Sequence, residues 1–152
     1  MRLDHLFDGE LSFDDETEVA IAASGDSDWL AYVRGTGHVR GEGVSGRLRW
    51  SNHPRRREDG VWLPRIGGVI ETDDGASILF RLDGYNVSLT EPFEYVHRSV
   101  AAAMSFAAAD ERYRWLNTVL GVVEGDVRVE DAGDAAHEVW RIRAYRCIPE
   151  LV

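Results

Sequence analysis

The chain has 152 residues, of which 44% are hydrophobic and 15 are glycines, a composition that suits one all-β domain with many turns. Its formal net charge of −10 repels a phosphate backbone, which argues against nucleic acid as a partner. The chain contains arginine but no lysine, so chemistry that needs a lysine Schiff base is excluded.

Cysteine, histidine and hydropathy patterns restrict the cellular setting. Cys147 is the single cysteine, so neither an internal disulfide nor a thiolate zinc cluster can form, and the five histidines are too far apart in sequence for a zinc motif. The acidic first twenty residues do not resemble a signal peptide, and no apolar run reaches the roughly 20 residues of a membrane helix. We therefore expect a cytoplasmic protein that has no metal or cofactor and does not enter a membrane.

Residues 71–84 give the clearest structural signal. Asp74-Gly75 favours the positive φ angles of a two-residue hairpin turn between strands at 61–72 and 76–84. After the turn, Ile78, Phe80 and Leu82 alternate with polar residues, which is the period of a half-buried strand. Gly67-Gly68 predicts a bulge in the strand before the turn.

The glycine-rich residues 37–46 superficially resemble a phosphate-binding loop. Such a loop follows a strand and opens a helix, whereas residues 44–50 alternate as a strand. The glycines therefore predict bulges, tight bends or a close approach of the backbone to a ligand. Arg55-Arg56-Arg57, in a predicted loop at 51–59, is either an anion site or a solvated charge run.

The remaining chain also reads mainly as strands. Residues 1–16 are an N-terminal arm or a first strand, 85–98 a loop or short helix, and 100–109 a strand or a helix by pattern alone. Further strands are expected at 18–24, 29–34 and 138–148, and the second of these ends at Gly35. Residues 118–123 and 127–131 are expected to form a hairpin around Glu124-Gly125-Asp126.

Two segments resemble the DUF3237 family, also called UPF0311. The first combines Gly-Glu-Gly-Val-Ser-Gly at 41–46 with Glu-Thr-Asp-Asp-Gly-Ala at 71–76. The second joins Phe106 to Glu-Arg-Tyr-Arg-Trp-Leu-Asn at 111–117, whose Tyr-x-Trp-Leu-Asn element is the most specific. The resemblance covers residues 28–148 and implies a lipocalin-like β-barrel in which 100–109 is a strand. The chain departs from the family at 52–55 and at Ala107-Ala108, where family carboxylates are absent.

We therefore predict one all-β domain over residues 1–152, a single antiparallel lipocalin-like or calycin-like barrel of about eight strands with little helix. Residues 112–117 are predicted to form one helical turn that closes an end of the barrel and lets Trp115 and Leu116 both enter it. Trp115 and Asn117 could instead form the floor of a ligand site.

The preferred function is binding of a small apolar or aromatic ligand inside the barrel. Its predicted lining is Trp62, Phe80, Met104, Phe106 and Trp140, with Arg65 or Arg112 available for an acidic group of the ligand. The alternative is a cofactor-independent isomerase, cyclase or lyase for a small aromatic or polyketide-like compound, whose acid or base would be Asp74, His38 or Glu42. A homodimer formed through an exposed edge strand is a third possibility.

Overall fold

The computed structural model describes residues 1–14, 19–24, 28–130 and 138–151 of the chain. The strands in this part of the chain are β1 (Arg2–Phe13), β2 (Val19–Ser24), β3 (Asp28–Arg40), β4 (Gly46–Asn52), β5 (Arg55–Arg56), β6 (Trp62–Leu63), β7 (Arg65–Thr72), β8 (Ser77–Ser88), β9 (His97–Ala108), β10 (Gly121–Val129) and β11 (Glu138–Ile148). A five-residue 3₁₀ turn, η1 (Arg114–Thr118), follows β9.

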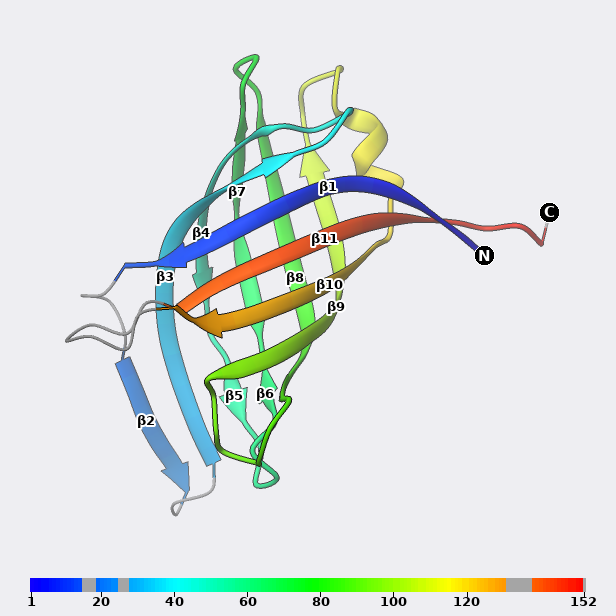
Figure 1. Ribbon diagram of the computed structural model, residues 1–152. Helices are drawn as coiled ribbons and strands as arrows, with labels where there is room; N and C mark the ends of the chain where they lie inside the picture. The colour runs from blue at the N-terminus through cyan, green and yellow to red at the C-terminus, as the bar shows by residue number, and fades with distance from the viewer. Residues whose placement is uncertain (15–18, 25–27, 131–137, 152) are drawn as a thin grey trace.

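Eight of these strands pair in a closed antiparallel circuit. The order around it is β1, β3, β4, β7, β8, β9, β10 and β11, and β11 returns to pair with β1 from Arg2↔Ile148 to Ser12↔Val139. β2 extends from β3, while the short β5 and β6 bridge β3 to β8 near one end (Figure 1). The predicted antiparallel barrel is confirmed.

Alternation along the strands builds the interior. On β8, Ile78, Phe80 and Leu82 are buried while their neighbours are exposed, and β9 alternates in the same way through Met104 and Phe106. The assignment of 100–109 as a strand is therefore confirmed, and so is a hairpin at Asp74-Gly75. The two-residue form of its turn was wrong, because β7 ends at Thr72, β8 begins at Ser77 and only Gly75 in the turn has positive φ, at 89°. The N–H of Gly75 donates to the Thr72 carbonyl over 3.0 Å.

Several predicted element boundaries were wrong. β3 runs through Gly35 to Arg40, and β8 continues to Ser88 without a helix among residues 85–98. The two strands beside Gly67 and Gly68 keep a continuous register, so there is no bulge at that position. β10 likewise runs straight through Gly125, where a hairpin was expected.

The two ends of the barrel differ. One end is covered by η1, whose Leu116 is fully buried beside Tyr113. Trp115 is 39% exposed, so the prediction that Trp115 enters together with Leu116 was wrong; its ring lies beside Gly43 instead. The opposite end carries β5, β6 and the connection 89–96 (Figure 1). Because η1 is so short, the described part of the chain contains no membrane-spanning helix.

Candidate functional site

A cavity of about 480 Å³ lies at the barrel end that carries β5 and β6. Small-molecule sites usually enclose about 300–1,000 Å³, so its size suits a compact organic ligand. Four aromatic side chains contribute to its wall: Phe13, Trp62, Tyr95 and Trp140. The Phe13 and Trp140 rings are 6.3 Å apart, as are the Trp62 and Tyr95 rings, so the wall contains two pairs of neighbouring aromatic rings.

Polar side chains form one layer of this cavity. Asn86 of β8 points inward, as Phe80 and Leu82 do. Arg98 of β9 also points inward, as Val100 and Met104 do. Asn52 and Glu138 continue the inward-facing rows of β4 and β11 in the same way. The interior is therefore apolar toward η1 and polar toward the cavity.

Arg98 and Glu138 are the main charged pair of this layer. Arg98 is 5% exposed, and its Nη2 lies 2.6 Å from Oε2 of Glu138, although the N–H bonds of Nη2 are not aligned with that contact. The indole N–H of Trp140 donates to Oε1 of Glu138 over 2.6 Å. The guanidinium carbon of Arg98 also lies 5.7 Å from the centre of the Tyr95 ring. These contacts fix both charged groups at the cavity wall.

Three buried polar atoms of the layer lack a hydrogen-bond partner among the described residues. They are Nε and Nη2 of Arg98, both donors, and Oδ1 of Asn86, an acceptor; of these, Nη2 is the atom in ion-pair contact with Glu138. Asn52 provides the contrast, because its Oδ1 accepts the backbone N–H of Arg65 over 2.9 Å. Both Arg98 and Asn86 line the cavity. Buried polar groups are nearly always paired, so an unpaired donor and an unpaired acceptor in the residues of its wall indicate groups available to a ligand.

Only two of the residues predicted from the sequence line this cavity, Trp62 and Trp140. Phe80, Met104 and Phe106 are buried within the packed core of the barrel. The Arg65 side chain is exposed at the start of β7. The predicted ligand residues thus divide between the cavity wall, the core and the surface.

The other predicted residues from this group lie near η1, at the end opposite the cavity. Asn117 hydrogen-bonds the backbone of Ala108 through both amide atoms, at 2.7 and 2.9 Å, and Trp115 is half-exposed. Arg112 forms ion pairs with Asp110 and Asp74 at 2.8 and 3.1 Å. These contacts tie η1 to the end of β9 and to the β7–β8 hairpin.

Asp74 is half-exposed within that hairpin, and its Oδ1 accepts hydrogen bonds from Thr72 Oγ1 at 2.6 Å and from Tyr113 Oη at 2.8 Å. The Thr72 bond, then the Tyr113 bond, hold the pKa of Asp74 below its ordinary value. Burial, and then the Asp74 hydrogen bond, raise the pKa of Tyr113. An ionised Asp74 therefore stabilises this end of the barrel.

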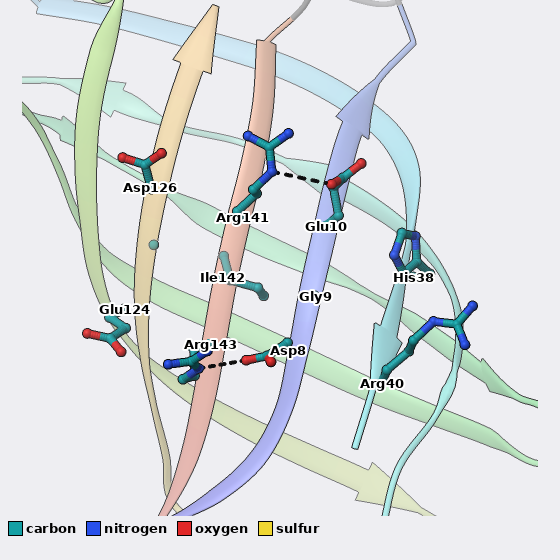
Figure 2. Close-up of a pocket in the computed structure, with 11 residues that line it drawn as sticks. Asp8, Gly9, Glu10, His38, Arg40, Glu124, Asp126, Arg141, Ile142 and Arg143 are labelled. Atoms are coloured by element: carbon teal, nitrogen blue, oxygen red, sulfur yellow. Dashed lines mark hydrogen bonds and ion pairs between the residues drawn. The ribbon is translucent and has the colours of Figure 1, made fainter. Parts of the chain in front are cut away.

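His38 and Glu42 also lie apart from the cavity. Glu42 is exposed in the connection between β3 and β4, and His38 lines a groove of about 540 Å³. The groove runs across the outward-facing side chains of β3, β1, β11 and β10, and its charges include Asp8, Glu10, Arg141 and Arg143 (Figure 2).

Two arginine–carboxylate ion pairs lie within this groove. Arg143 Nε lies 2.7 Å from Asp8, and Arg141 Nε lies 3.5 Å from Glu10 (Figure 2). The hydrogen bond from Arg143, followed by that of His5, holds the pKa of Asp8 below its ordinary value. Within the described residues, no three histidine, cysteine or carboxylate side chains are grouped as a metal site. We therefore take the cavity, with its unpaired buried atoms, as the better candidate site.

The barrel and its end cavity can now be compared with known proteins. The family model described as "Protein of unknown function (DUF3237)" matches residues 1–147. The chain belongs to the DUF3237 family. No functionally curated protein matches the sequence significantly. Membership in DUF3237 confirms the resemblance carried by the Tyr-x-Trp-Leu-Asn element.

Solved structures support the same fold. A Clostridium acetobutylicum protein of unknown function superposes with a TM-score of 0.77 at 17% identity, covering 97% of this chain and 100% of its own. A β-barrel-like protein from Acinetobacter baumannii gives 0.73 at 16% identity, with 95% of both chains covered. A protein described as an enzyme from Penicillium herquei gives 0.58 at 20% identity, with 93% of both covered. At these identities, the likeness concerns the fold alone.

The sequence interpretation missed all four residues of the polar layer: Asn52, Asn86, Arg98 and Glu138. A signal for it was present, because each of these residues is an even number of positions from buried apolar residues of its own strand. Extending the inward-facing parity past the apolar run of each strand would have selected them. Phe13 carried the same signal, two positions after the buried Leu11 of β1, whereas Tyr95, in the connection 89–96, carried none.

Proposed function

We propose that the cavity binds a small apolar or aromatic ligand. The observation that carries this proposal is the convergence of a buried arginine and a buried asparagine, each with an unpaired atom, on a cavity walled by aromatic rings. Apolar walls with a few convergent polar groups are the usual composition of a small-molecule site. The walls supply burial of the ligand, and the polar atoms supply its orientation.

Native mass spectrometry of the purified protein tests the proposal, combined with titration of the neutral fluorescent dye 6-propionyl-2-dimethylaminonaphthalene. Ala31 lines the cavity, so Ala31→Trp should fill part of it and abolish binding of the dye. Ala107→Trp, at an exposed position of β9, is the matched control and should bind the dye normally. Equal binding by both variants, or no retained molecule and no dye binding in the wild type, would contradict the proposal.

Catalysis in the same cavity is a second candidate, favoured by the presence of Glu138. A carboxylate beside a buried guanidinium can accept a proton from the carbon next to a ligand carbonyl while Arg98 stabilises the resulting enolate oxygen. That proton transfer begins many isomerisations, cyclisations and eliminations. In this candidate, Glu138 takes the role that the sequence suggested for Asp74, His38 or Glu42.

The catalytic candidate is tested with 2-tetralone, a small bicyclic ketone, in deuterated water. Wild-type protein should accelerate exchange of the protons next to the carbonyl, as followed by NMR, and Glu138→Gln should abolish the acceleration. If Glu138→Gln accelerated proton exchange as much as the wild type, the activity would not depend on the Glu138 carboxylate. No acceleration by the wild type would leave binding as the sole proposed function.

A further inference from the structure

The charges around the cavity are already offset within the protein. Arg98 is paired with Glu138 at 2.6 Å, and the third charged lining residue, Asp14, lies 3.7 Å from Nε of Arg34. A carboxylate ligand that approached Arg98 would also approach Glu138 and would meet repulsion in a partly desolvated site. The net charge of −10 further disfavours the approach of an anion.

The polar atoms that remain unpaired require a ligand with two kinds of group. Arg98 Nε needs a hydrogen-bond acceptor, and Asn86 Oδ1 needs a donor. The two side chains occupy neighbouring strands: Asn86 lies opposite Val100, and Arg98 is two residues along from Val100 on the same inward face. A diagonal pair of this kind lies within reach of one compact ligand.

We infer that the ligand class is a neutral aromatic carbonyl compound that also carries an O–H or N–H group, with the carbonyl oxygen on Arg98 and the donor on Asn86. This inference rests on the proposed function and narrows it. It replaces the acidic ligand group expected from the sequence with an uncharged one. A site built to pair a ligand hydroxyl or N–H discriminates strongly against an analogue without it, because the buried acceptor is then left unpaired.

Isothermal titration calorimetry with two scaffolds tests the ligand class. The probes are 2-quinolone and 6-acetyl-2-naphthol, their methylated counterparts 1-methyl-2-quinolone and 6-acetyl-2-methoxynaphthalene, and the anion 2-naphthoate. We expect at least one parent compound to bind at least about tenfold more tightly than its methylated counterpart and than 2-naphthoate. The inference is overturned if neither parent is preferred, or if 2-naphthoate binds most tightly.

Variants at Asn86 separate hydrogen bonding from steric effects of the methyl group. Asn86→Leu removes the acceptor at similar volume and should abolish the preference for the parent compound, whereas Asn86→Asp keeps an acceptor oxygen and should preserve the preference. A preference that persists in Asn86→Leu would show that the methyl group merely clashes, and would overturn the inference. Melting temperatures establish that each variant is folded. The comparison of parent and methylated probes on the wild-type protein does not depend on these variants.

The outcomes for the two proposals are distinct. Binding of these aromatic probes without any preference for the donor overturns the inference on ligand class and leaves the proposed function in place. Absence of binding by every probe, together with failure of the dye titration, overturns both.

Discussion

Arg98 and Glu138 form an ion pair with 2.6 Å between Nη2 and Oε2, although their strands, β9 and β11, are separated by β10. Two side chains on non-adjacent strands can meet in this way only by reaching across the inner face of the strand between them. The pair therefore lies across the wall of the cavity. Because both residues line the cavity, the same contact stabilises the barrel and holds the two charged side chains of the site in position.

Replacing Arg98 should destabilise the barrel. Arg98→Met leaves Glu138 without its cation, and loss of one partner of a largely buried pair costs about 2–4 kcal/mol when the remaining partner is partly solvated. Urea denaturation followed by tryptophan fluorescence measures the change. Arg128→Met is the control, since Arg128 forms an exposed pair with Asp126 and should cost less than about 1 kcal/mol. Equal losses in the two variants would contradict a special role for the buried pair.

Close packing of β8 on β9 predicts a sharp difference between two glycines. A Cβ at Gly84 would lie 2.2 Å from the Ala101 carbonyl oxygen, so Gly84→Ala forces backbone to move and should cost about 1–3 kcal/mol. At Gly67 the nearest atom would be 3.9 Å away, and Gly67→Ala should be nearly neutral. Thermal unfolding of both variants is the measurement, and a Gly84→Ala protein as stable as Gly67→Ala would contradict the described packing.

The two neighbouring large residues of η1 should differ in importance. Leu116 is fully buried, so Leu116→Ala should cost about 2–5 kcal/mol, whereas the half-exposed Trp115 should cost only about 1–2 kcal/mol when truncated to alanine. Chemical denaturation of the two variants compares them directly. A larger loss for Trp115→Ala than for Leu116→Ala would indicate that the indole is buried in solution.

Asp74 should make stability depend on pH. Its pKa in the folded protein lies below the ordinary value, so its stabilising contribution is complete above the unfolded pKa of about 3.9 and is lost as the pH falls through the folded pKa. Denaturation midpoints of wild type and Asp74→Asn should differ most near pH 6–7 and converge below about pH 4. Asp73→Asn controls for the change in net charge. A difference that does not vary with pH would contradict an ionised Asp74 network.

The fold could be predicted from the sequence where local patterns agree with the barrel. Asp74-Gly75 specifies a tight turn, and the alternation from Ile78 to Leu82 specifies a strand with one buried face, so both were recovered. Gly125 was misread because Glu-Gly-Asp is typical of a turn. A Cβ at Gly125 would lie 3.1 Å from Cβ of Val100 and 3.3 Å from Cγ2 of Ile142, contacts that come only from distant strands.

The candidate site could be predicted less well for a related reason. Trp62 and Trp140 were selected because large aromatic residues often line pockets, and both do line the cavity. Arg98 and Glu138 were overlooked, since they lie 40 positions apart in the sequence, on two strands that are not adjacent, and no motif links them. Their association depends on the pairing of β9 and β11 with β10, which no local pattern encodes.

Pairing between β1 and β11 also constrains the order in which the protein can be completed. Residues 2–12 pair with residues 139–148, so one edge of β1 stays without its neighbour until residues 139–148 have left the ribosome. Contacts of such long sequence separation form slowly, and until they form the unpaired edge of β1 is prone to pair with a strand of another chain. Expression at high levels should therefore reduce the yield of native protein, because unpaired strands of different chains pair with one another. Slower synthesis at low temperature should restore the yield of native protein.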